Sequence, residues 1–303
     1  MVEFPRKARI LKQLVVLFCL LCAAPVAAAP QSIESFNIGD SFALHSKILN
    51  EDRTYWVQLP DSYAAGAAAG RSYPVLYLLD GRAYFYVLTG VLHHLSSPRA
   101  GVERVPEMIV VAPVNTKRTR DLTPTHMASG PYSENSGGAA TFLRFMKEEL
   151  FPEIESRYRT TAERTLVGHS LGGLFVLNAF MEQPDLFKNY IAIDPSLWWD
   201  DQILVKRLRQ QRPKVFVPPV QVFICMAGWP VGYGSVAEER AHRTSIRHFQ
   251  SILASRQNAS LKVQYRDFED ETHMSVPLIA IYRGLIFAFD GYVKPTDASR
   301  SAP

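Results

Sequence analysis

The sequence predicts an α/β domain with a mostly parallel, twisted sheet, helices on both faces and an antiparallel N-terminal edge. Short apolar, β-branched runs alternate with longer amphipathic stretches along most of the 303 residues, as in repeated strand–helix units. Residues 73–79 are apolar almost throughout, which is typical of a strand buried on both faces of a parallel sheet. Residues 41–49 and 53–59, joined by a short polar connection, predict an antiparallel hairpin at one edge.

The remaining elements follow from the same periodicity. After residues 73–79, the predicted strands are 107–114, 165–167, 190–193, 220–227 and 262–265. The predicted helices are 83–95, 139–158, 175–181, 201–210, 237–254 and 276–289. The Ala/Gly-rich stretch 64–70 is expected to be a loop.

The N-terminus has the organisation of a secretory signal peptide. Four basic residues between Arg6 and Lys12 precede a short apolar run at 14–24, and small residues at 27–29 supply a cleavage site. The apolar run is too short to span a membrane well, although an uncleaved anchor is the alternative. We therefore expect three parts: a signal peptide at 1–28, one domain at 29–293 and a flexible tail at 294–303. This division predicts a periplasmic or secreted protein without a stable membrane anchor.

The net charge gives no reason to expect nucleic acid as a partner. The formal charge of the whole chain is +4, but four basic residues and Glu3 lie in the predicted signal peptide, and without them the charge is +1. The sequence likewise suggests neither a metal nor another cofactor. His242 and His248, for example, are six residues apart and do not share a helix face well. Cys225 is the one cysteine outside the signal peptide, so we expect a buried thiol and no internal disulfide.

The centre of the chain carries a G-x-S-x-G pentapeptide, residues 168–172, between a β-branched run and a helix-like apolar stretch. In that context the serine lies on a sharp strand-to-helix turn that exposes its hydroxyl, and this predicts an α/β-hydrolase fold with Ser170 as nucleophile. Glycines suit positions 168 and 172, because strand and helix backbones approach closely there. The N–H of Leu171 begins the helix and can donate to an oxyanion. The side chain of His169 should point in a different direction from that of Ser170, so we expect it to have a structural role only.

A base and a second oxyanion donor can be placed by chain order. His273 follows the last predicted strand and precedes the last helix, where the hydrolase order of serine, acid and histidine requires the base. The second donor should come from the loop after the first parallel strand. There Gly81 allows a tight turn, and the N–H of Arg82 is the predicted donor.

The acid of the triad is ambiguous in the sequence. It should follow the strand that ends at Ala227, but residues 228–235 contain no carboxylate; Glu238 and Glu239 are the first ones, and Glu238 is the predicted acid. Glu238 also fits a capping box that begins at Ser235. The alternatives are Glu239, Asp194, Asp267, Asp270, or a Ser–His dyad without an acid.

Six stretches spread over the mature chain carry a resemblance to a known family: 77–81, 119–124, 138–157, 168–174, 195–199 and 271–277. The D-L-T-P sequence at 121–124 and P-S-L-W-W at 195–199 are far more specific than the G-x-S-x-G pentapeptide alone. The chain resembles the putative-esterase (esterase D-like) family of α/β hydrolases, and within it the periplasmic siderophore esterases that cleave enterobactin-type trilactones.

The resemblance implies a serine carboxylic-ester hydrolase with Ser170 as nucleophile, His273 as base, and the Leu171 and Arg82 amides as oxyanion donors. It implies no cofactor, and a small-molecule ester such as a ferric siderophore as the partner. The chain departs from the family at two places. Asp194 stands where the family usually has serine, and Trp229-Pro230 stand where it often has an acid. Some periplasmic members look as if they use a dyad.

Two side chains match a catecholate substrate, which is aromatic and anionic. Arg118 lies after the strand 107–114, on the edge of the sheet where ligands bind, and could pair with catecholate oxygens. Trp198 could stack on a ring, while one of Trp198 and Trp199 is expected in the core. The alternatives are a general carboxylesterase or acyltransferase acting on another ester, and a hydrolase-fold binding protein with an incomplete triad.

Overall fold

The computed structural model describes residues 37–97, 103–114, 117–228 and 235–293. Residues 1–37 and 38–303 form two separate units, and every strand and helix given below belongs to the second. The predicted signal peptide at 1–28 and the predicted tail at 294–303 lie outside the described residues. Within the described part, no helix is both long and apolar enough to cross a membrane.

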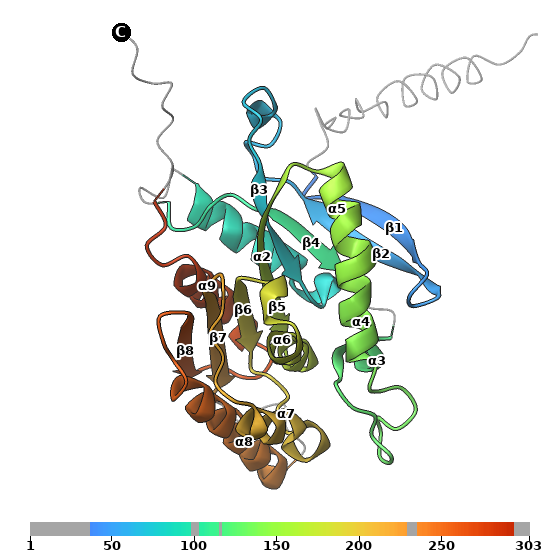
Figure 1. Ribbon diagram of the computed structural model, residues 1–303, viewed down its shortest axis with the longest axis vertical. Coiled ribbons are helices and arrows are strands. Elements are labelled where there is room, and N and C mark those ends of the chain that lie inside the picture. Colours follow the sequence, from blue (N-terminus) through green and yellow to red (C-terminus); the bar gives the residue numbers. More distant parts are fainter. Residues whose placement is uncertain (1–36, 98–102, 115–116, 229–234, 294–303) are drawn as a thin grey trace, which may run out of the picture. The chain divides into compact units, whose positions relative to one another are not determined.

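The second unit is built on one eight-stranded sheet with the order β1-β2-β4-β3-β5-β6-β7-β8. Figure 1 shows β1 and β2 at one edge of this sheet and β8 at the other. The strands are β1 (Asp40–Ser46), β2 (Glu51–Gln58), β3 (Tyr73–Leu78), β4 (Ile109–Pro113), β5 (Thr160–His169), β6 (Asn189–Ile193), β7 (Val220–Ala227) and β8 (Leu261–Phe268). β1 pairs antiparallel with β2 and β2 antiparallel with β4, whereas all other pairs are parallel. The predicted mostly parallel sheet with an antiparallel N-terminal edge is confirmed.

Helices cover both faces of the sheet because successive strand side chains alternate between them. Leu76 and Leu78 of β3 pack in an apolar cluster with residues of α2 and α9, while Tyr77 belongs to a second cluster with residues of α4 to α8. The helices are α2 (Gly81–Ser96), α3 (Arg118–Leu122), α4 (Ala139–Phe145), α5 (Phe151–Arg157), α6 (Leu171–Glu182), α7 (Trp199–Gln210), α8 (Val236–Ala254) and α9 (Val276–Ala288). Cys225 in β7 is fully buried, as predicted, and burial raises the pKa of its thiol.

Three elements differ from the prediction. The helix expected at 139–158 consists of α4, a π-helical stretch at Met146–Leu150 and α5. β5 begins at Thr160 rather than at 165, because Glu163 and Arg164 are paired with charged neighbours and are therefore tolerated in the strand. The short helix α3 was not predicted, since its charged sequence has no apolar periodicity.

Candidate active site

Ser170 lies on the turn between β5 and α6, in a backbone conformation that residues other than glycine rarely adopt. Its φ is 60° and its ψ is −118°, as expected for a nucleophile on a strained strand-to-helix turn. A Cβ atom at Gly168 would lie 2.5 Å from the carbonyl carbon and oxygen of Gly172. Glycine at position 168 therefore allows α6 to begin directly after the strand.

The two predicted oxyanion donors both lie in the first turn of a helix. Leu171 begins α6, and Arg82 is the second residue of α2. The first N–H groups of a helix have no carbonyl partner within it and can face a ligand. Arg82 and Ser170 line the same cavity, together with His273. This placement is compatible with an oxyanion hole, whose function stays a prediction.

The carboxylate that contacts His273 is Asp194, at the carboxyl end of β6. Its Oδ2 lies 2.6 Å from Nδ1 of His273, and its side chain is fully buried. Glu238 is placed differently: it is exposed at the start of α8, where its N–H donates to Oγ of Ser235 and its carboxylate accepts a hydrogen bond from the same hydroxyl. The expectation that Glu238 orients His273 is therefore wrong, and its capping-box interpretation is the one the contacts support.

The Asp194 carboxylate is surrounded by hydrogen-bond donors. Oδ1 lies 2.9 Å from Nε2 of His242 and accepts the N–H of Ala227 at 3.2 Å. Burial alone would raise the pKa of Asp194, but the hydrogen bonds from His242 and His273 outweigh it and hold that pKa well below its ordinary value. Asp194 is thus an anion at neutral pH, and it can stabilise positive charge on His273.

Two further side chains near Ser170, those of Ser196 and His169, were not assigned a catalytic role from the sequence. Oγ of Ser196 lies 3.3 Å from Oγ of Ser170, and the N–H of Ser196 donates to the carbonyl of Ser170. His169 is buried, with Nδ1 2.8 Å from the hydroxyl of Tyr84. Ligand atoms of His169, Asp194 and His273 lie within 4.8 Å of one another. Within this group the hydrogen bond joins Asp194 and His273, whereas Nδ1 of His169 faces Tyr84.

Ser170 and His273 line two cavities. The first has a volume of about 370 Å³ and is lined by Arg82 and by Arg118 with its partner Asp80. The second has a volume of about 640 Å³ and carries the rings of Tyr132 and Trp198. A substrate bound across the serine would therefore meet cationic groups on one side and aromatic surface on the other.

Arg118 is paired more strongly than the sequence suggested. Its Nε and one terminal nitrogen donate to the two carboxylate oxygens of Asp80, at 2.6 and 2.8 Å. Burial acts to lower the pKa of Arg118, but the bonds to Asp80 dominate and raise it. Nη1 takes no part in these two bonds, and contact of Arg118 with a ligand stays a prediction.

The two tryptophans divide as expected, one at the cavity and one in the core. Trp198 is half-buried and lines the aromatic cavity, with its ring centroid 6.1 Å from that of Tyr132. Trp199 is fully buried, and its Nε1–H donates to the carbonyl and hydroxyl oxygens of Thr125. Stacking on a substrate ring is therefore open to Trp198.

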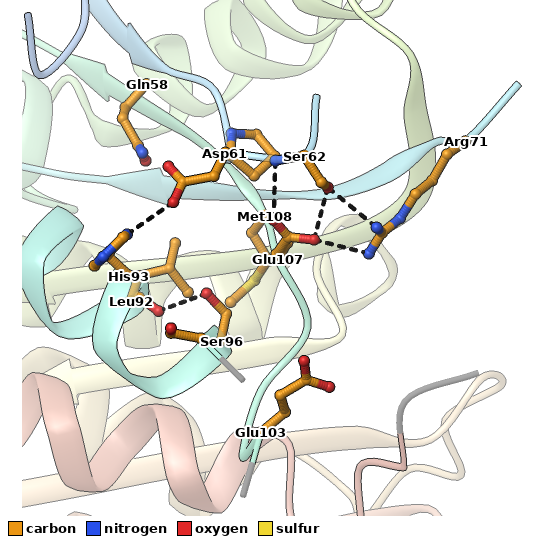
Figure 2. A pocket seen from close by; sticks show the side chains of 12 residues that line it. Gln58, Asp61, Ser62, Arg71, Leu92, His93, Ser96, Glu103, Glu107 and Met108 are labelled. Carbon is orange, nitrogen blue, oxygen red and sulfur yellow. Dashed lines mark hydrogen bonds and ion pairs between the residues drawn. The ribbon is translucent and has the colours of Figure 1, made fainter. Parts of the chain in front are cut away.

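Another cavity, of about 460 Å³, lies at the amino end of the parallel strands, next to the residues that precede β4. Figure 2 shows several of its polar side chains engaged with one another: Glu107 accepts hydrogen bonds from Ser62 and pairs with Arg71 at 3.0 Å. Ser170 and Asp194 instead follow the carboxyl ends of their strands, where open α/β sheets bind ligands. We therefore place the active site at Ser170.

Comparisons with known proteins agree with this site. A family model described as "Putative esterase" matches residues 46–220. The ferri-bacillibactin esterase BesA of Bacillus subtilis is 31% identical over 255 residues, which cover 79% of this chain and 86% of that protein. A siderophore enterobactin esterase of Emericella nidulans is 29% identical over 264 residues, covering 74% of this chain and 84% of that one.

Solved structures give the same result. An IroE-like serine hydrolase from Shewanella oneidensis superimposes with a TM-score of 0.73 at 34% identity, covering 83% of this chain and 80% of that chain. The siderophore hydrolase EstA from Aspergillus nidulans superimposes with a TM-score of 0.72 at 25% identity, covering 87% and 98%. Since the family model spans more than half of the sequence, the chain belongs to the "Putative esterase" family of α/β hydrolases and is a serine ester hydrolase.

Proposed function

We propose that the enzyme cleaves esters through Ser170, His273 and Asp194. The contact between Asp194 and Nδ1 of His273 at 2.6 Å carries this proposal, because it supplies the acid that the sequence left open. The absence of an identified acid was the only support for a binding protein with an incomplete triad, and the contact removes that support.

The proposed reaction assigns one role to each of these groups. With its Nδ1–H held by Asp194, His273 takes the proton of Ser170 at Nε2 as Oγ attacks the ester carbonyl carbon. The N–H groups of Leu171 and Arg82 donate to the oxyanion that forms. His273 then protonates the departing alkoxide, which leaves as an alcohol. The acyl group remains on Ser170 as an acyl-serine. Water, deprotonated by His273, attacks the acyl-serine and releases the carboxylic acid, with the proton returned to Ser170.

The substrate we propose is an ester of a catecholate siderophore, whose cleavage releases the iron that it carries as cargo. Relatives named as siderophore esterases support this class of substrate. The cavities support it too, because Arg82 and Arg118 suit catecholate oxygens, and Tyr132 and Trp198 suit aromatic rings. Residues 1–28 support export to the periplasm or beyond.

Steady-state kinetics test the substrate class. We expect kcat/KM for ferric or apo enterobactin to exceed that for short p-nitrophenyl esters by at least about tenfold, equivalent to about 1.4 kcal/mol of transition-state binding. Comparable turnover of the simple esters would instead favour a general carboxylesterase.

A labelling experiment tests the nucleophile separately. A fluorophosphonate probe should label the wild-type enzyme at neutral pH and leave the Ser170→Ala variant unlabelled. Labelling of the alanine variant at the wild-type rate would show that another residue is the nucleophile.

A further inference from the structure

Asp194, the acid of the proposed triad, has a fully buried side chain. Asp194 follows β6, one strand before β7, after which the chain order of a hydrolase predicts the acid. Both of its carboxylate oxygens accept hydrogen bonds: Oδ2 faces His273, and Oδ1 faces His242 and the N–H of Ala227. The orientation of the carboxylate is therefore set by groups on β7, on α8 and in the loop before α9.

His242 is the donor on the side away from His273. It lies in α8, one helical turn after Glu238, and its side chain is 1% exposed. Its ring stands edge-on to the ring of His273, with an angle of 88° and a centroid distance of 5.9 Å. The carbonyl of His242 accepts a hydrogen bond from Oγ of Ser245, within the same helix. The helix thus presents this imidazole to the carboxylate.

The direction of the hydrogen bond follows from the charge of Asp194. An ionised carboxylate only accepts hydrogen bonds, so Nε2 of His242 carries the proton in this contact. A neutral imidazole with its hydrogen on Nε2 is sufficient, and the interaction requires no second positive charge in the site. His242 is therefore suited to hold the anion in place and not to exchange protons with it.

We infer that His242 is a positioning residue, which orients the carboxylate of Asp194 so that Oδ2 remains directed at Nδ1 of His273. The inference rests on the proposed role of Asp194 as the acid of the triad. The terminal torsion of aspartate is broad, so a carboxylate that loses the hydrogen bond from His242 is less restricted. Rotation of the carboxylate would lengthen the bond to His273 and misorient the imidazole in the transition state.

The test compares two replacements of His242 with p-nitrophenyl acetate as the substrate. His242→Phe keeps a ring of similar size but has no donor, whereas His242→Gln keeps an N–H donor at a similar reach. We expect kcat to fall about tenfold or more in the Phe variant with KM within about twofold of wild type. The Gln variant should retain kcat within about threefold. Active-site titration with a fluorophosphonate normalises each rate to the amount of folded enzyme.

The same measurements in an Asp194→Asn background show whether the effect passes through Asp194. If it does, His242→Phe lowers kcat further by less than about twofold in that background, because coupled residues are not additive. A full second loss of rate would overturn the inference, as would wild-type kcat in His242→Phe or equal losses in the Phe and Gln variants. If the Phe variant does not fold, His242→Met serves as the variant without a donor.

The outcome for Asp194 alone separates this inference from the proposed function. If Asp194→Asn retains wild-type kcat, the assignment of the triad acid fails, and the role of His242 fails with it. If Asp194→Asn is slow and His242→Phe is not, only the inference about His242 is overturned.

Discussion

The buried His169 predicts how the stability of the enzyme depends on pH. Its side chain lies at the end of β5 with 3% exposure and faces the hydroxyl of Tyr84. Burial, and to a smaller extent the nearby His273, lower the pKa of His169 from 6.5 to about 3. His169 is therefore neutral in the folded protein over the pH range in which the unfolded chain takes up a proton at the same position.

The sign and size of the effect follow from this difference in proton binding. Below pH 6.5 the unfolded state binds more protons than the folded state, so the free energy of unfolding falls as the pH falls, until the folded pKa is reached. With folded and unfolded pKa values of about 3 and 6.5, His169 accounts for a loss of about 2 kcal/mol between pH 7 and pH 5. Because the residue is buried, screening by solvent reduces this value little.

Urea unfolding followed by tryptophan fluorescence measures the effect. The variant is His169→Asn, which keeps a polar atom near Nδ1 for Tyr84 and does not titrate. It should be less stable than wild type at pH 7 because ring packing is lost, but its further loss between pH 7 and pH 5 should be smaller by about 2 kcal/mol. Ser170→Ala, which changes no titrating group, should show the wild-type loss.

Equal losses of stability between pH 7 and pH 5 in wild type and His169→Asn would refute the reasoning. That result would mean that folded His169 binds a proton as readily as the unfolded chain does. The burial of the imidazole would then have no effect on its titration.

Three further sets of substitutions can be tested by urea unfolding and kinetics. Trp199→Ala should cost about 3–5 kcal/mol of stability, and Trp198→Ala less than half as much, because only Trp199 is fully buried; equal losses would contradict this division. Ser235→Ala should cost about 1 kcal/mol by removing the α8 cap, with kcat unchanged, and a large loss of kcat would implicate the cap in catalysis. Gly168→Ala places a methyl group 2.5 Å from the backbone of α6 and should lower both the melting temperature and kcat. Its control, Gly90→Ala, adds a methyl group in open space within α2 and should stabilise the protein by up to about 1 kcal/mol; similar effects at both positions would contradict the argument from close approach.

The parts of the site that local sequence defines were the ones predicted correctly in position. Ser170 lies on the strand-to-helix turn because glycines on both sides allow the close approach of the backbones, and that pattern is visible in five residues. His273 could be placed by chain order, since it follows the last strand of the sheet. Both features require no knowledge of how distant segments pack.

The sequence could not single out Asp194 as the acid or predict the partner of Arg118, because these contacts join residues that are distant in sequence. Asp194 contacts His273, 79 residues later, and nothing local distinguishes it from Glu238. Arg118 pairs with Asp80, 38 residues earlier. The helix α3 that contains Arg118 was also missed, because it is held in part by an ion pair between Asp121 and the buried Arg53, and not by an apolar stripe.

The position of Asp194 has a consequence for engineering this enzyme. Ser170 and Asp194 follow neighbouring strands locked in register, with His169 opposite Ile193 and the N–H of Ser170 donating to the Ile193 carbonyl at 3.0 Å. The spacing of nucleophile and acid is thus built into the sheet. Residues 229–234, between β7 and α8, contain no carboxylate in the sequence and so supply no acid to the proposed triad. Directed evolution of new ester selectivity should therefore leave the register of β5 and β6 unchanged, because a shift there would alter the spacing of Ser170 and Asp194.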